Sequence, residues 1–271
     1  KTLRCVHKIM LKERIKTGVI GLIFLLITMS FFEEYVFRLI IASVFIIAAW
    51  EWFNLAREAN RLLCFINTII LFLLGFYFQS NNFSIEHMFI FFNLSLLFWL
   101  FCLVLLFFYP IRYKNIITIG FGYASLITGY IALDWIYVFS SQYFFTFLCL
   151  IWAMDIGAYF TGKKFGKIKL AKSISPNKTW EGLIGGLVFT IMLSFLASKI
   201  IYFDAIMFAF FSISLGLISV VGDLTVSMFK RNSKQKDTGK ILPGHGGFLD
   251  RIDSIISSAP LFALGCIYFL F

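Results

Sequence analysis

The longest polar run in this apolar chain, residues 227–253, holds three kinds of group that together suit phosphoryl or nucleotidyl transfer. A glycine-rich turn at residues 243–247 contains His245, the one histidine placed among other polar candidates. Cations grip phosphate oxygens, glycines let backbone N–H groups approach an anion, and carboxylates can hold Mg²⁺. The charged residues of interest are Lys230, Arg231, Lys234, Lys236, Lys240, Asp250, Arg251 and Asp253. This run indicates a protein that handles phosphate groups.

Asp223 and Asp250 are the pair favoured for metal binding. Asp223 lies in an apolar stretch, about 9 Å of helix rise from its inner end, and Asp250 opens the last apolar stretch. Both acids are predicted to be catalytic, together with Lys236 and His245. Asp253 has an alternative interpretation, as the cap of the last helix.

A second polar segment, residues 163–181, supplies further candidates for substrate binding. Its end carries hydroxyl, amide and ammonium groups at the start of an expected helix: Ser175, Asn177, Lys178 and Thr179. Helix capping by Thr179 or Ser175 explains part of this pattern, but a helix N-terminus also offers N–H groups to a phosphate. Upstream, Asp155 lies about 10 Å before the inner end of its apolar stretch. A carboxylate at that depth costs at least about 2.5 to 3.5 kcal/mol, so it is expected to face a cavity or a partner.

The composition excludes an ordinary soluble protein. Of the 271 residues 60% are hydrophobic, 20% are aromatic and only 14% are charged. A bilayer core about 30 Å thick requires roughly 20 apolar residues per helix. We therefore predict an all-α, polytopic membrane protein of about nine transmembrane helices. They are expected near residues 17–32, 35–53, 62–79, 88–109, 116–139, 142–162, 182–203, 205–229 and 254–271.

The positions of the cations predict the orientation of these helices and argue against a nucleic-acid partner for the net charge of +10. With the N-terminus in the cytoplasm and the C-terminus outside, every Lys and Arg except Arg38 and Lys199 falls on the cytoplasmic side, as the positive-inside rule requires. The polar candidates fall in one half of the chain. We therefore divide it into N-terminal helices at residues 1–140 and a catalytic part at residues 141–271, which contains two basic cytoplasmic loops.

Two acids in the first half of the chain are expected to lie at the membrane interface and to have no part in the chemistry. Glu51 lies between Trp50 and Trp52 at the end of the second apolar stretch, where an interfacial anchor is favoured over a functional group. Asp134 lies next to Trp135, about 8 Å of helix rise from the outer end of its stretch. Reaching the interface is expected to satisfy Asp134.

Taken together, these segments resemble the phosphatidate cytidylyltransferases, also called CDP-diacylglycerol synthases. Residues 175–182, Ser-Pro-Asn-Lys-Thr-Trp-Glu-Gly, are similar to one signature segment of that family, and residues 155–166 resemble another. There Ile156 and Lys163 depart from the residues usual in the family. The C-terminal signature matches in register at Ser227, Lys230, Arg231, Lys236, Asp237, Gly239, His245, Gly246, Gly247, Asp250, Arg251 and Asp253.

The resemblance implies a Mg²⁺-dependent integral membrane enzyme that makes CDP-diacylglycerol and pyrophosphate from CTP and phosphatidate. Asp223 and Asp250 would be the metal-binding acids, with K⁺ as a candidate second cation. The active site would lie on the cytoplasmic side of a bacterial inner membrane. The residues expected to bind substrate are Asp155, Ser175, Asn177, Lys178, Thr179, Ser227, Lys230, Arg231 and Arg251.

Two other functions are compatible with parts of this pattern. A CTP-dependent lipid kinase of the polyprenol type also combines a polytopic body with cytoplasmic phosphate-binding loops. A transporter would use intramembrane acids as well, but it should show polar features in both halves of the chain. The oligomeric state is left open by the sequence, with a homodimer as one alternative.

Overall fold

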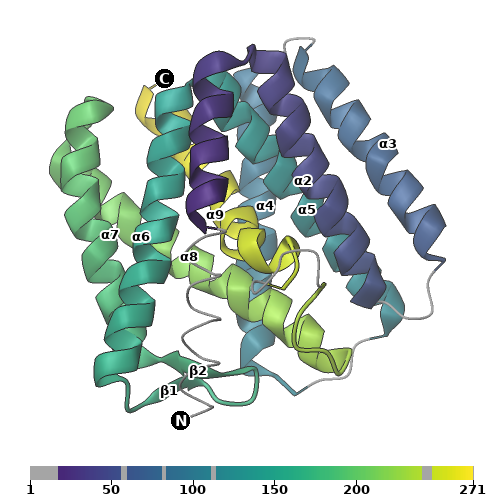
Figure 1. The fold of residues 1–271 in the computed structure, drawn as a ribbon, viewed down its shortest axis with the longest axis vertical. Helices are drawn as coiled ribbons and strands as arrows, with labels where there is room; N and C mark the ends of the chain where they lie inside the picture. The colour runs from purple at the N-terminus through teal and green to yellow at the C-terminus, as the bar shows by residue number, and fades with distance from the viewer. Residues whose placement is uncertain (1–17, 56–59, 81–83, 111–113, 240–245, 271) are drawn as a thin grey trace.

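The computed structural model describes residues 18–55, 60–80, 84–110, 114–239 and 246–270, and these form a bundle of helices with one small hairpin (Figure 1). A first apolar helix spans Gly18–Phe31. The remaining elements, in chain order, are α2 (Glu34–Leu55), α3 (Arg61–Ser80), α4 (Ile85–Phe107), α5 (Asn115–Phe139), α6 (Ser141–Phe165), β1 (Lys169–Ala171), β2 (Ser175–Thr179), α7 (Trp180–Ile200), α8 (Ala205–Asn232) and α9 (Leu249–Leu270).

The chain is a polytopic helical membrane protein, as the composition predicted. Within the described residues, seven helices are long and apolar enough to cross a bilayer, and two shorter apolar helices span Gly18–Phe31 and Arg61–Tyr77. Each of the nine predicted stretches therefore contains a helix. The orientation of the termini and the division of the chain near residue 140 stay predictions.

Helix α9 lies at the centre of the bundle and packs against α8, α5 and α4. In its apolar stretch 83% of the residues are buried, compared with at most 50% in the other helices long enough to cross a membrane. Helices in lipid approach closely where side chains are small, and Gly222 of α8 provides such a contact with α9. A Cβ at Gly222 would collide with Ser257 and with the backbone of Asp253. The Ser257 hydroxyl also donates to the Ile218 carbonyl of α8, at 3.0 Å.

Helices α6 and α7 form the other tight pair, and glycines again set their separation. A Cβ at Gly185 would collide with Thr161, and one at Gly157 would lie 2.7 Å from the Cβ of Phe189. A Cβ at Gly186 would lie 2.7 Å from the backbone carbonyl oxygen of Met154. The two helices therefore run in contact up to the hairpin that connects them.

That hairpin was not predicted, since the sequence suggested only a polar loop. Strands β1 and β2 pair antiparallel, with Lys169 opposite Thr179 and Ala171 opposite Ser175. The strand Ser-Pro-Asn-Lys-Thr has little intrinsic β propensity, so we attribute the pairing to the close ends of α6 and α7. The predicted cap is confirmed at Thr179, whose hydroxyl accepts from the Gly182 N–H at 3.1 Å. Ser175 does not cap the helix, because it lies within β2.

The expectation that Asp134 reaches the membrane interface was wrong. Its side chain is completely buried and accepts two hydrogen bonds from Arg38 of α2, each 2.9 Å long. Arg38 also lies 4.4 Å from the ring centre of Phe76. A buried carboxylate requires such a paired cation, and the partner here lies 96 residues away in the sequence.

Candidate active site

A cavity of about 430 Å³ is lined by residues of α6, β2, α7, α8 and α9. The strand β2 belongs to the hairpin at one end of the bundle (Figure 1). Five carboxylates line it, together with three cations and several apolar side chains. Eight of the predicted site residues are among the lining residues: Asp155, Asn177, Lys178, Thr179, Asp223, Lys230, Asp250 and Arg251. The two polar segments singled out in the sequence therefore meet in one place.

Helix α8 contributes Asp223 and Lys230 to the cavity wall. Ser227 lies four residues after Asp223 and three before Lys230, on the same face of the helix. The Ser227 hydroxyl donates to Asp223 Oδ1 at 3.3 Å. The other carboxylate oxygen of Asp223 lies 2.5 Å from Lys178 Nζ, which comes from β2. This ion pair connects the hairpin to α8 across the cavity.

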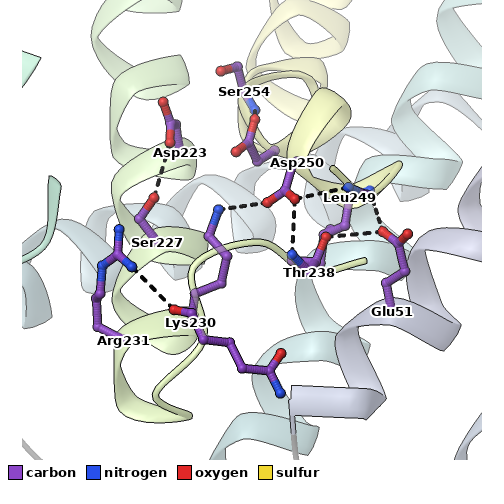
Figure 2. A network of polar contacts seen from close by, with 12 residues as sticks. Glu51, Asp223, Ser227, Lys230, Arg231, Thr238, Leu249, Asp250 and Ser254 are labelled. Carbon is purple, nitrogen blue, oxygen red and sulfur yellow. Dashed lines mark hydrogen bonds and ion pairs between the residues drawn. The ribbon is translucent and has the colours of Figure 1, made fainter. Parts of the chain in front are cut away.

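The first turn of α9 contributes Asp250, which is held by three hydrogen bonds (Figure 2). Lys230 Nζ donates to Oδ1 at 2.6 Å. The backbone N–H groups of Thr238 and Gly247 donate to Oδ2 at 3.0 and 3.1 Å. Both side chains of the Lys230–Asp250 pair are buried. Asp250 therefore has a fixed position, and it organises the segment that precedes α9.

Asp155 and Asp253 complete the acidic lining. Asp155 of α6 is open to the cavity, as its depth in an apolar helix predicted. Asp253 is buried in the second turn of α9, which begins at Leu249, and its Oδ1 accepts from the Ser254 N–H at 2.9 Å. Helix capping by Asp253 was therefore wrong. Asp253 lines the cavity, and the sequence alone did not distinguish that role from helix capping.

The remaining predicted residues lie outside the cavity lining. Arg231 donates to the backbone carbonyls of Ile174 and Gln235 at 3.0 and 3.2 Å, so its described contacts join α8 to the hairpin turn. Ser175 lies in β2, and Lys236 is exposed beyond the end of α8. Ser227 contacts the cavity only through Asp223. His245 lies outside the described residues.

Besides Asp253, two acids at or beside the cavity were missed as site residues. Asp237 lines it and had been used only as part of a signature. Glu51 of α2 contacts Thr238 and Leu249, the chain neighbours of the lining residues Asp237 and Asp250. It is only 1% exposed, so the interfacial anchor favoured from the sequence was wrong. The signal that could have identified Glu51 is an acid within an apolar helix, the same signal that identified Asp155.

The donor atoms of the cavity fit a hard divalent cation. Mg²⁺ is usually held by one or two carboxylates and completes its shell with water and substrate phosphates. Asp223 and Asp250 project into the same cavity from neighbouring helices and offer only oxygen donors. Among the described residues no group of three or more acidic, cysteine or histidine side chains is placed to hold a metal alone. Two carboxylates that share a metal with substrate match this arrangement better than an all-protein cage.

The fold and cavity together define a helical membrane protein with a cavity lined by both carboxylates and cations. Residues 12–269 match the Cytidylyltransferase family. A phosphatidate cytidylyltransferase of Haemophilus influenzae is 34% identical over 289 aligned residues, covering 97% of this chain and 99% of that protein.

Two further relatives carry the same name. The one from Pseudomonas aeruginosa is 34% identical, covering 94% of this chain and 96% of its own. The one from Bacillus subtilis is 38% identical, covering 63% of this chain and 66% of its own. The chain therefore belongs to the cytidylyltransferase family. This membership supports neither of the two alternative functions, lipid kinase and transporter.

Proposed function

We propose that this protein transfers CMP from CTP to phosphatidate, forming CDP-diacylglycerol and releasing pyrophosphate. One observation carries the proposal: in a chain of the cytidylyltransferase family, the segments around Lys178 and Asp250 line one cavity that offers both cations and carboxylates. The body of the protein is a membrane bundle, where a diacyl lipid substrate resides. The product enters phospholipid biosynthesis.

In this reaction a phosphate oxygen of phosphatidate attacks the α-phosphorus of CTP. A new P–O bond forms, the bond between the α-phosphorus and the bridging oxygen breaks, and pyrophosphate leaves with that electron pair. The nucleophile is already an anion at neutral pH, so the cavity needs no strong general base. It needs cations that offset the repulsion between two anionic substrates and hold them in line.

Lys178, Lys230 and Arg251 are the cavity's cations for that task. In the structure, Lys178 contacts Asp223 and Lys230 contacts Asp250. We propose that the three cations, with Asn177, Thr179 and Ser227, bind the triphosphate and the lipid phosphate. Lys236 and His245 complete the proposed site from the segment before α9, and Ser175, Arg231 and Asp155 complete the substrate-binding set.

Asp223 and Asp250 are the proposed ligands of Mg²⁺, with K⁺ as a candidate second cation. When bound, Mg²⁺ would neutralise charge that develops on the phosphoryl oxygens. The residues themselves fix the geometry: Ser227 orients Asp223, while Lys230 and two backbone N–H groups orient Asp250.

We place the cavity on the cytoplasmic side of a bacterial inner membrane. The support is the concentration of lysines in the hairpin and after α8 in the sequence. The hairpin and the C-terminal end of α8 lie at the same end of the bundle (Figure 1). CTP is a cytoplasmic nucleotide, so this orientation gives it direct access. A homodimer stays a prediction, which cross-linking in native membranes would check.

The decisive assay gives purified enzyme CTP that is labelled at either the α or the γ phosphorus, with phosphatidate or with a polyprenol as the lipid. The proposal requires α label in the lipid, γ label in pyrophosphate, and no reaction with the alcohol. Transfer of γ label into lipid would reject it in favour of a kinase.

A further inference from the structure

Glu51 lies near the C-terminal end of α2, in the half of the chain that holds none of the signature segments. Its side chain is 1% exposed, although it is a carboxylate in an apolar helix. Figure 2 shows it facing Thr238 and Leu249, which lie between α8 and α9 and at the start of α9. Glu51 Oε2 accepts from the Thr238 hydroxyl at 3.1 Å and from the Leu249 N–H at 2.9 Å.

These contacts lead directly to Asp250. Thr238 uses its hydroxyl for Glu51 and its backbone N–H for Asp250, so it bridges the two acids. The Leu249 N–H is one of the unpaired donors at the start of α9, so Glu51 acts as a cap supplied by another helix. A negative charge is also favourable at that end of the helix dipole.

The turn of α2 that contains Glu51 also contacts the C-terminal end of α8 and the residue that follows it. The Ser233 hydroxyl, just after α8, donates to the Leu55 carbonyl at 2.9 Å. The rings of Trp52 and Phe229 lie 5.3 Å apart. One turn of α2 therefore contacts the polar segment both where it leaves α8 and where it enters α9.

The backbone passes so close to Glu51 that two glycines are required. A Cβ at either Gly239 or Gly247 would collide with the carboxylate. The second oxygen, Oε1, is buried without a hydrogen-bond partner among the described residues. A half-satisfied buried carboxylate is costly, and the two hydrogen bonds that Oε2 accepts offset part of that cost.

We infer that Glu51 is a positioning residue for the transfer reaction: it fixes Thr238 and the first turn of α9, and through them the carboxylate of Asp250. The inference rests on the proposed function, because it assigns Asp250 to the reaction. It also gives the N-terminal helices a role in the active site.

The test uses the full-length protein with Glu51→Ala and Glu51→Gln, and measures two quantities. One is hydrogen exchange at the amides of Thr238, Gly247 and Leu249, and the other is the rate of CMP transfer at varied CTP. In Glu51→Ala we expect exchange at these amides to rise about tenfold or more. We expect kcat to fall about 10- to 100-fold, as when an orienting partner is lost. Glu51→Gln keeps an acceptor oxygen and should restore both quantities to within about threefold of wild type.

Asp134→Asn is the matched control, since Asp134 is another buried acid that contacts α2. It should lower thermal stability and leave both the three amides and kcat close to wild type. If Glu51→Ala does not fold, Thr238→Val decides the question: it removes the hydroxyl and keeps the N–H, and should lower kcat about three- to tenfold.

The inference is overturned if exchange or kcat is unchanged in the folded variant, or if Asp134→Asn produces the same local increase in exchange. It is also overturned if Glu51→Gln fails to restore either quantity. If the wild-type protein transfers no CMP, the proposed function fails. The exchange measurements then still decide whether Glu51 holds the segment.

Discussion

The two lysine–aspartate pairs of the cavity differ in exposure, and this difference predicts different roles for the two lysines. Lys178 and Asp223 have side chains 25% and 28% exposed. Lys230 and Asp250 have side chains only 9% and 6% exposed. Ion pairs open to water contribute little stability, so Lys178 can exchange its partner for a phosphate at small cost. Lys230 is bound to a buried acid and also supports the structure.

Replacement of each lysine by Met should separate these roles. Lys178→Met should lower CMP transfer strongly and leave the melting temperature nearly unchanged. Lys230→Met leaves Asp250 buried without its cation, which costs about 3–5 kcal/mol in comparable cases. It should therefore lower both activity and melting temperature. Thermal unfolding in detergent and initial rates at saturating CTP measure the two effects. Equal loss of stability in both variants would contradict this distinction.

Asp223→Asn tests the proposed metal acid on α8. The change keeps the shape of the side chain and removes its charge, so the protein should remain folded and inserted while activity falls by about 100-fold or more. Asp204→Asn is the control, because Asp204 caps the opposite end of the same helix. Initial rates over a range of Mg²⁺ concentrations are the measurement. Near-normal turnover would remove Asp223 from the site.

At the scale of the elements, the cavity depends on the close approach of α6 and α7. Asp155 comes from α6, while Lys178 comes from the strand that leads into α7. Gly185 and Gly186 let the two helices approach where larger side chains would collide. Close packing through small residues is a main source of helix association in a membrane, so the glycines determine how far apart Asp155 and Lys178 lie.

Gly186→Ala should therefore impair both stability and activity. Its Cβ would lie 2.7 Å from the Met154 carbonyl oxygen, a backbone atom that cannot move aside without shifting α6. Overpacking of this kind costs about 1–3 kcal/mol. Gly120→Ala is the control, because a Cβ there has no other atom within 4 Å. Thermal unfolding of the two variants gives the comparison. A similar melting temperature for both variants would show that α6 and α7 accommodate the added methyl group without loss of stability, which would contradict the prediction.

At the scale of the whole molecule, charge is distributed unequally between the two ends of the bundle. The cavity end gathers acids and cations from α6, β2, α8 and α9. The buried Arg38–Asp134 pair joins α2 and α5 outside this cavity. The excess of lysine near the cavity predicts which end faces the cytoplasm.

Cysteine labelling tests that orientation. In a background without native cysteines, Lys169→Cys and Lys234→Cys should resist an impermeant thiol reagent in intact cells and react after lysis. Tyr202→Cys is the control for the outer side: Tyr202 is 95% exposed between α7 and α8, at the far end of α7 from the hairpin. It should react in intact cells. Labelling of position 169 or 234 from outside would reject the predicted topology.

The sequence by itself determined the membrane class, the positions of the nine helices and the two polar segments of the site. These features are local: a run of about 20 apolar residues must cross a bilayer as a helix. An acid within such a run must face a cavity or a partner. Asp155 and Asp223 were identified by that argument, and both line the cavity.

Only the tertiary structure decided which residues meet. Glu51 contacts residues 187 and 198 positions away, and Arg38 contacts Asp134 across 96 positions. Hydropathy is similar on all faces of α2, so it does not predict which side of α2 faces α9. That choice depends on packing, where Gly222, Gly239 and Gly247 leave room for a neighbouring helix or carboxylate. For this reason the sequence identified the acids and lysines of the cavity, while the support that Glu51 gives them became visible only in the folded bundle.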